Sequence, residues 1–289
     1  MKKRLQFIIN PISGGKKKDF VPQLIHQHLD KTKFDYDLWY WEEVEGLKPQ
    51  IDHLKQEKYD GVIAVGGDGT INQISAELID TELLMGFVPM GSGNGLTRQL
   101  EVPMAPLEAI QHLNSAEAKL IDTGLINNLP FINVAGIGFD AKVSHSFAQS
   151  KGRGLLNYGR YVVSEYRETQ NMDYRIHVDG KIRDVKAFML SIANGSQWGN
   201  NFFVAPNASL NDGLLDLVIM TKPRLMKIPK LVTDLSRQRI QDNSLVEIIK
   251  GKKFVVECSP ELAHVDGEPC SKAEKFEIRI KPASLQVFV

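Results

Sequence analysis

The sequence predicts a two-domain protein of the α/β plus all-β class, in which a doubly wound parallel sheet domain precedes an antiparallel β-sandwich. The first observation is a repeated order of strand, loop and helix in the N-terminal part. The second is a change near residue 122, after which short strands alternate with turn signals such as Asp179-Gly180 and Asn194-Gly195. We therefore expect domains at residues 1–122 and 123–289.

The N-terminal elements follow from hydrophobic periodicity. Apolar runs predict strands and helical spacing predicts helices, in the order 5–9 (strand), 20–29 (helix), 36–41 (strand), 47–58 (helix), 62–65 (strand), 71–79 (helix) and 83–88 (strand). Ligands of such sheets bind at the carboxyl ends of the strands. The loops at 10–16, 66–72 and 91–95 all follow strands, so they should share one edge.

The C-terminal part is predicted to be mostly β. Its expected strands lie at 121–124, 131–134, 175–178, 187–192, 215–219, 254–258, 276–280 and 285–289, and its expected helices at 155–168 and 225–239. Many short strands separated by turns favour an antiparallel sandwich or barrel.

Charge and cysteine content exclude several classes. The formal net charge is zero, so no overall field attracts nucleic acid or a membrane. Cys258 and Cys270 are the two cysteines and show neither zinc-site nor disulfide-framework spacing. The N-terminal apolar run is too short for a signal peptide, and no segment approaches about 18 consecutive apolar residues. We expect a cytoplasmic protein, at most peripheral to the inner face of the membrane, that binds no nucleic acid.

The loop Gly66-Gly67-Asp68-Gly69-Thr70 is the strongest local signal. Glycines let a backbone approach a polyphosphate, and the helix that follows presents its positive end to the same anion. Asp68 would act through magnesium, a polar proton or a neighbouring hydroxyl, because a carboxylate repels bare phosphate. The alternative is a tight turn in which Thr70 caps the helix.

Two further loops support the phosphate hypothesis. Gly91-Ser92-Gly93-Asn94-Gly95 also precedes a helix, but it lacks the dinucleotide fingerprint because its third glycine comes one residue early. The loop at 10–16 lacks the Walker A pattern, and Lys16 is its candidate for balancing phosphate charge. Three glycine-bearing loops on one sheet edge favour a polyphosphate site.

These residues resemble a known family. The segments at 10–14, 66–72 and 91–94 are similar to the three nucleotide loops of the diacylglycerol kinase catalytic family, which includes bacterial lipid kinases, sphingosine kinases and ceramide kinases. The blocks 133–141, 194–195, 211–216 and 266–268 extend the resemblance along nearly the whole chain. The resemblance implies a phosphofructokinase-like nucleotide domain, a β-sandwich lipid-substrate domain and ATP-dependent phosphorylation of the primary hydroxyl of a lipid, such as diacylglycerol or a sphingoid base.

The resemblance also implies site residues. Asp68 would lie near the transferring phosphate, and Asp212, with backbone groups near Ser209 and Leu214, would hold Mg²⁺. The implied ATP-binding set is Asn10, Ser13, Gly14, Lys16, Gly66, Gly67, Asp68, Gly69, Thr70, Asn72, Gly91, Ser92, Gly93 and Asn94.

Phosphoryl transfer needs a carboxylate that orients the attacking hydroxyl. We favour Glu268, with Asp266 and Asp68 as rivals. Read without the family, Asp266-Gly267 and Asp212-Gly213 are hairpin turns. The family's threonine after the second strand is replaced near Tyr40-Trp41, whose rings would stack on adenine or fill the sheet surface.

Residues 222–239 combine six basic residues, one acid and interleaved apolar residues. Such a helix lies on an anionic bilayer or packs on the sandwich with a wet basic face. The expected partner is therefore a lipid substrate at the membrane surface, and a homodimer is left open.

Three other functions compete with a lipid kinase. An NAD kinase-like phosphotransferase uses a similar Gly-Gly-Asp-Gly-Thr loop, although that family's later motifs are missing here. A non-catalytic nucleotide-binding regulator would have lost acids that this chain keeps. A membrane adaptor would act through residues 222–239 alone.

Overall fold

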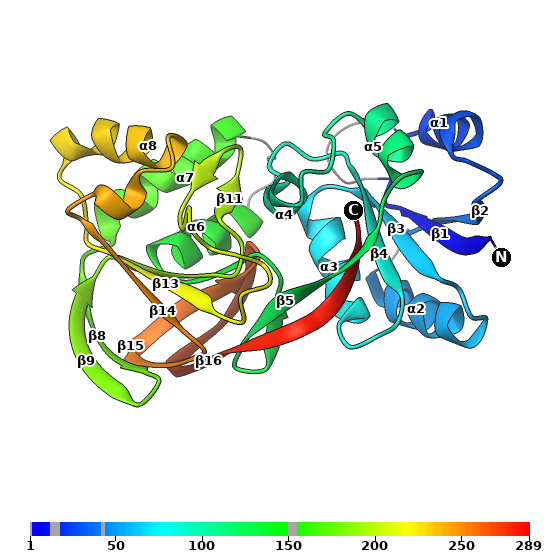
Figure 1. Cartoon of the computed structure of the whole chain (residues 1–289). Helices are drawn as coiled ribbons and strands as arrows, with labels where there is room; N and C mark the ends of the chain where they lie inside the picture. Colours follow the sequence, from blue (N-terminus) through cyan, green and yellow to red (C-terminus); the bar gives the residue numbers. More distant parts are fainter. Residues whose placement is uncertain (1, 12–17, 42–43, 150–154) are drawn as a thin grey trace. The chain divides into compact units, whose positions relative to one another are not determined.

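The computed structural model describes residues 2–11, 18–41, 44–149 and 155–289. The chain forms two compact units, one made of Met1–Ile121 with Ala283–Val289 and the other of Asp122–Pro282 (Figure 1). The division falls one residue before the predicted boundary at 122. The last seven residues belong to the first unit, whereas the sequence had assigned them to the second.

The first unit is built on a parallel sheet with the order β4-β3-β1-β2. Its strands are β1 (Lys3–Ile9), β2 (Phe34–Tyr40), β3 (Gly61–Gly66) and β4 (Leu84–Pro89). Every residue of β3 and β4 is buried, as expected for strands covered on both faces. The helices are α1 (Val21–His28), α2 (Leu47–Gln56), α3 (Asp68–Leu78), α4 (Gly95–Gln99) and α5 (Pro106–Leu113), with a 3₁₀ turn, η2, at Val44–Gly46.

Helices cover the two faces of this sheet in pairs. α1 contacts α5 and α2 contacts α3, and Figure 1 shows the two pairs on opposite sides of the strands. This is the doubly wound arrangement that the alternation of strands and helices predicted. Of the two rings, Tyr40 ends β2 and is 45% exposed, whereas Trp41 follows the strand and is buried, so one of them fills the core.

The second unit is mainly antiparallel. Its strands are β5 (Ala118–Ile126, which begins in the first unit), β6 (Leu129–Phe131), β7 (Val134–Gly138), β8 (Met172–Val178), β9 (Lys181–Ala187), β10 (Met189–Ala193), β11 (Gln197–Gly199), β12 (Phe202–Phe203), β13 (Leu215–Met220), β14 (Val246–Gly251), β15 (Lys253–Val265) and β16 (Glu268–Phe288). They pair in the order β14-β13-β10-β7-β15-β16, and β8 joins β15 to β9. The predicted change from a parallel sheet to antiparallel strand pairing is confirmed.

Helices α6 (Phe139–Ala148), α7 (Leu155–Glu168) and α8 (Ile228–Ser236), with 3₁₀ turns η3 (Leu225–Lys227) and η4 (Ile240–Asp242), complete this unit. The sequence did not predict α6. The hydrophobic core of the second unit contains Phe131, Tyr174, Phe254 and Phe276, all nearly or fully buried. Within the described ranges, no helix combines the length and hydropathy required to cross a bilayer.

Candidate active site

The loops after β1, β3 and β4 are tied together by side chains. The Asn10 Nδ2 donates to the Thr70 Oγ1 at 3.1 Å, which joins the first loop to the second. The carboxylate of Asp68 joins the second loop to the third: its Oδ2 accepts the N–H of Asn94 at 2.8 Å and its Oδ1 that of Gly95 at 3.1 Å. Described residues of all three predicted loops therefore meet at one edge of the sheet.

Glycines allow this close approach. A Cβ on Gly91 would lie 2.8 Å from the Cα of Gly67, and a Cβ on Gly93 would lie 2.7 Å from the Asp68 Oδ2. Neither neighbour has room to withdraw, since one is backbone and the other is hydrogen-bonded. A side chain at position 91 or 93 would therefore push the second and third loops apart.

The N-terminus of α3 offers an anion site. No side chain caps this 11-residue helix, since its N-cap residue is Gly67, and the Asp68 carboxylate accepts N–H groups of the third loop. Asn94 is 2% exposed; its Nδ2 donates to the carbonyl oxygen of Gly91, while its Oδ1 has no hydrogen-bond partner in the described parts of the chain. Uncapped N–H groups, a helix dipole and glycine backbone together make a cradle for phosphate.

The remaining ATP-binding predictions are only partly placed. Ser92 is exposed, and Gly69 and Asn72 are half-buried. Ser13, Gly14 and Lys16 lie outside the described residues. Lys18 is buried, and this burial lowers the pKa of its ammonium group.

The acidic motif of the second unit forms a hairpin turn. Asp266 and Gly267, with φ of 49° and 88°, connect β15 to β16. The Asp266 Oδ2 accepts the N–H of Ile132 at 2.7 Å, and its Oδ1 accepts those of Asn133 and Val134 at 2.9 Å each. Burial raises the pKa of Asp266, and the three N–H donors oppose that rise. Asp266 therefore holds the turn in place.

Glu268 differs from its two rivals. Its side chain is exposed and has no hydrogen bond or ion pair among the residues that the structure describes. Asp68 and Asp266 each accept two or more backbone N–H groups. Glu268 is thus the candidate base whose carboxylate is available to a substrate proton.

A buried pair that the sequence missed lies behind this turn. The His264 Nδ1 accepts the Gly267 N–H at 3.2 Å, so the ring proton belongs on Nε2, which lies 3.4 Å from the Asp140 Oδ2. The Ser191 Oγ donates to the same oxygen at 2.8 Å. The nearest signal was Asp140 itself, which falls in the family block 133–141.

The predicted magnesium site contains a cation that belongs to the chain. The Lys250 Nζ lies 2.9 Å from the Asp212 Oδ2 and 3.4 Å from the Asp216 Oδ2, and it donates to the Asn207 carbonyl oxygen. The Asp212 Oδ1 accepts the N–H of Leu214 at 3.0 Å, and the Ser209 Oγ donates to the Asn211 Oδ1. These contacts fit a turn held by a lysine better than a site for a resident divalent ion.

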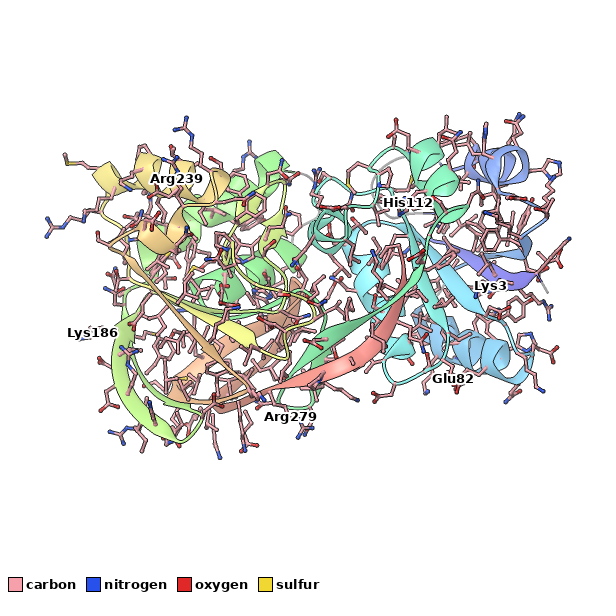
Figure 2. All side chains as sticks on the ribbon, viewed as in Figure 1. Lys3, Glu82, His112, Lys186, Arg239 and Arg279 are labelled. Carbon is pink, nitrogen blue, oxygen red and sulfur yellow. The ribbon has the colours of Figure 1, made fainter. Side chains whose placement is uncertain are left out.

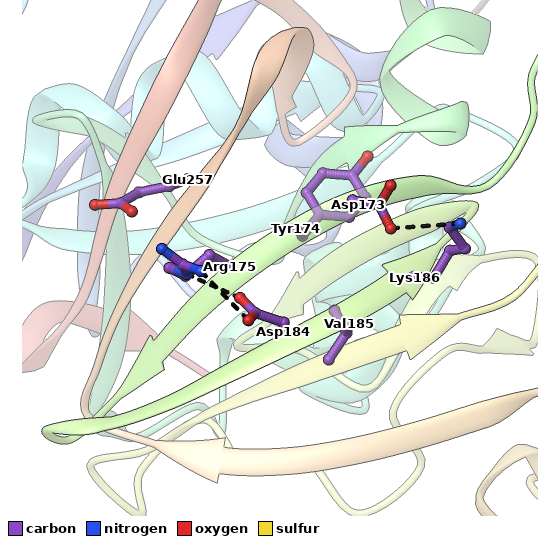
Figure 3. Close-up of a pocket in the computed structure, with 7 residues that line it drawn as sticks. All are labelled: Asp173, Tyr174, Arg175, Asp184, Val185, Lys186 and Glu257. Atoms are coloured by element: carbon purple, nitrogen blue, oxygen red, sulfur yellow. Dashed lines mark hydrogen bonds and ion pairs between the residues drawn. The ribbon is translucent and has the colours of Figure 1, made fainter.

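A hollow of about 560 Å³ lies over the β8–β9 hairpin (Figure 3). Four of the five charged side chains that line it are paired with one another, Arg175 with Asp184 at 2.8 Å and Lys186 with Asp173 at 3.6 Å, and the fifth, Glu257, lies 3.7 Å from the Nε2 of His177. None of the predicted site residues lines it. We assign it no part in catalysis.

Fold and loops define the class, an α/β domain with a glycine-rich loop site joined to a β-sandwich-like domain. The model of the diacylglycerol kinase catalytic domain matches residues 4–126, and that of the YegS C-terminal NAD kinase beta sandwich-like domain matches residues 133–289. The chain belongs to the family that combines a diacylglycerol kinase catalytic domain with a YegS C-terminal domain.

Curated relatives agree with that assignment, and a solved structure shares the fold. The chain is 27% identical to a diacylglycerol kinase of Staphylococcus aureus over 276 aligned residues. These residues make up 93% of this chain and 87% of the relative. It is 28% identical to an uncharacterised Synechocystis protein over 97% of this chain and 69% of the relative. The crystal structure of a diacylglycerol kinase from Bacillus anthracis superposes with a TM-score of 0.76 at 19% identity, over 99% and 96% of the two chains, and shows the same fold.

Proposed function

We propose that the protein is an ATP-dependent kinase that phosphorylates the primary hydroxyl of a lipid, such as diacylglycerol, a sphingoid base or a related lipid. Family membership supports a lipid kinase. The observation that carries the proposal is the cradle, in which the Asp68 carboxylate ties the uncapped start of α3 to the loop at Asn94 and Gly95.

In this proposal the first unit holds ATP. Backbone N–H groups at the start of α3 would bind the phosphates, and the absence of side chains at Gly91 and Gly93 would let the nucleotide approach the backbone. Mg²⁺ that accompanies ATP would supply charge neutralisation on the phosphate oxygens.

Glu268 would act as the general base. Its carboxylate would accept the proton of the substrate hydroxyl while the hydroxyl oxygen forms a bond to the γ-phosphorus and the bond to the ADP oxygen breaks. The hydrogen bonds accepted by Asp266 and by the buried His264 would hold the turn that presents Glu268.

An NAD kinase-like activity is the second candidate. It is favoured by the YegS-type domain, whose model is described as NAD kinase beta sandwich-like. Its acceptor would be a soluble nucleotide and not a lipid. One assay with both acceptors therefore separates the two functions.

The test is incubation of the purified protein with γ-labelled ATP, a total lipid extract and NAD. We expect the label in a lipid band. Label in a nucleotide product would support the NAD kinase-like reaction, and ATP binding without any labelled product would support a non-catalytic regulator. Glu274→Gln serves as a matched control for Glu268→Gln, since Glu274 is an exposed acid on the same strand, β16.

A further inference from the structure

Helix α8 packs on the second unit through part of its apolar surface. Leu231 and Leu235 are buried in a cluster with Phe188, Met220 and other side chains. The Lys230 Nζ lies 2.6 Å from the Oδ2 of Asp234, the single acid within residues 222–239. This helix is therefore anchored to the unit in the ordinary way, and its buried face is unavailable to any partner.

The turn in front of the helix is different. Leu225 is 70% exposed and Met226 is 94% exposed, and together they occupy η3, immediately before α8. Val232, on the outer side of α8, is 44% exposed. A single exposed apolar residue is ordinary, but two consecutive ones on one turn present an apolar tip that nothing in the described chain covers.

Two exposed basic residues flank this tip in the sequence, and a third lies at the other end of α8. Arg224, Lys227 and Arg237 are exposed and make no ion pair or side-chain hydrogen bond within the parts that the structure describes. Lys222 is excluded from this set because its Nζ donates to the Thr169 carbonyl oxygen at 2.6 Å. Figure 1 shows α8 in gold at the periphery of the second unit, and Figure 2 shows side chains, Arg239 among them, projecting from this region.

We propose that residues 224–227, the docking turn, bind the surface of an anionic lipid bilayer. Leu225 and Met226 would enter the acyl boundary, while Arg224 and Lys227 would contact headgroup phosphates. Charge complementarity selects this occupant, since unpaired cations at Arg224 and Lys227 flank an apolar tip on a chain whose net charge is zero. The proposal rests on the proposed function, because a lipid substrate is found at such a surface.

The hairpin of β8 and β9 provides a matched control. Ile182 is 63% exposed and is preceded by the exposed Lys181. Its neighbours carry paired charges, such as Arg183 with Glu247 at 2.7 Å. The double variant Met226→Ser/Lys227→Glu and the control Ile182→Ser/Lys181→Glu remove equivalent groups from the two surfaces.

The experiment is co-sedimentation of the full chain, without ATP, with vesicles of phosphatidylglycerol and phosphatidylcholine or of phosphatidylcholine alone. We expect binding to the anionic vesicles that weakens with salt, falls about tenfold or more in the docking-turn variant and is unchanged in the control. Equal binding by the docking-turn variant, equal loss in the control, or no binding to anionic vesicles would each overturn the proposal. The last result would leave an acidic protein as the occupant.

The two proposals fail in different ways. If no lipid is labelled in the kinase assay, vesicle binding is still measured, because it needs no turnover. If the docking-turn variant loses activity on detergent-dispersed lipid as well as on vesicles, the docking turn does more than bind a surface, and the proposal is wrong.

Discussion

Single carboxylates carry different tasks in this protein, and the difference lies in what each oxygen already accepts. Asp68 and Asp266 hold backbone N–H groups, whereas Glu268 is exposed and, among the described residues, accepts nothing. A general base must be free to take a proton. Their hydrogen bonds therefore distinguish Glu268, as the candidate general base, from Asp68 and Asp266.

Glu268→Gln is the first test at this scale. The amide keeps the shape of the side chain but cannot accept the hydroxyl proton, so kcat should fall by roughly 10²–10⁴-fold. ATP affinity should stay unchanged, because the cradle belongs to the other unit. Steady-state kinetics with titration of ATP would measure both, and Glu274→Gln should behave like the wild type. Equal losses in kcat and ATP affinity would rule out a base.

Asp68→Asn tests the hydrogen bonds by which the Asp68 carboxylate ties the second loop to the third. The amide replaces one acceptor oxygen with a donor that faces an N–H of the third loop, so the loops should separate. We expect ATP affinity to fall about tenfold or more and the free energy of unfolding to fall by about 1–3 kcal/mol. Calorimetric titration with ATP and chemical denaturation would measure these changes. Wild-type ATP affinity in a folded variant would show that these hydrogen bonds do not shape the site.

At the scale of elements, the turn before β13 is held by a lysine of β14. Asp216 is buried, which raises the pKa of its carboxyl group, and the neighbouring Lys250 ammonium opposes that rise. The same ammonium lies 2.9 Å from Asp212, where the sequence predicted magnesium. Two strands thus share one internal cation.

Lys250→Met should make this turn depend on an added cation. We expect the free energy of unfolding to fall by about 1–3 kcal/mol, since a partly buried ion pair loses one partner. The pKa of Asp216 would rise further in the folded variant. An acid whose pKa is raised in the folded state contributes stability below its unfolded pKa of about 4, and that contribution is lost as the pH rises. The loss of unfolding free energy in the variant, relative to the wild type, should therefore be larger at about pH 7.5 than at about pH 4.5.

Thermal melts with Mg²⁺ or EDTA check this account. The wild-type Tm should be insensitive to both, while Mg²⁺ should partly restore the Tm of Lys250→Met. A wild-type Tm that drops in EDTA would instead favour the magnesium ion predicted from the sequence, with Ser209, Asp212 and Leu214 around it.

The sequence predicted the contacts that follow from a parallel sheet and missed those that do not. The cradle was predictable because each glycine-bearing loop directly follows its strand in sequence, as at Gly66 to Thr70, and parallel strands bring such loops to one edge. The pair of Asp140 and His264 joins residues far apart in the chain. Hydrophobic periodicity does not predict such a contact, because the two residues come together only after β7 and β15 have paired.

The end of the chain shows the same limit. The sequence predicted a strand at 285–289 but placed it in the second domain. In the structure β16 continues into the first unit, where Val287 pairs in parallel with Met85 and the backbone of Val289 bonds to that of Glu117. An apolar pattern predicts a strand, and it does not say which sheet the strand joins.

This return of the chain makes the first unit depend on residues 283–289, which lie more than 150 residues beyond the rest of that unit in the sequence. Leu285 is fully buried, so Leu285→Ala should lower the free energy of unfolding by about 2–5 kcal/mol and loosen the sheet edge beside β4. Leu120→Ala is the matched control, since Leu120 is 52% exposed, and it should cost far less. Hydrogen exchange of β3 and β4 amides, beside denaturant melts, would localise the effect. Unchanged exchange in β4 with a large loss elsewhere would show that the C-terminal residues belong energetically to the second unit.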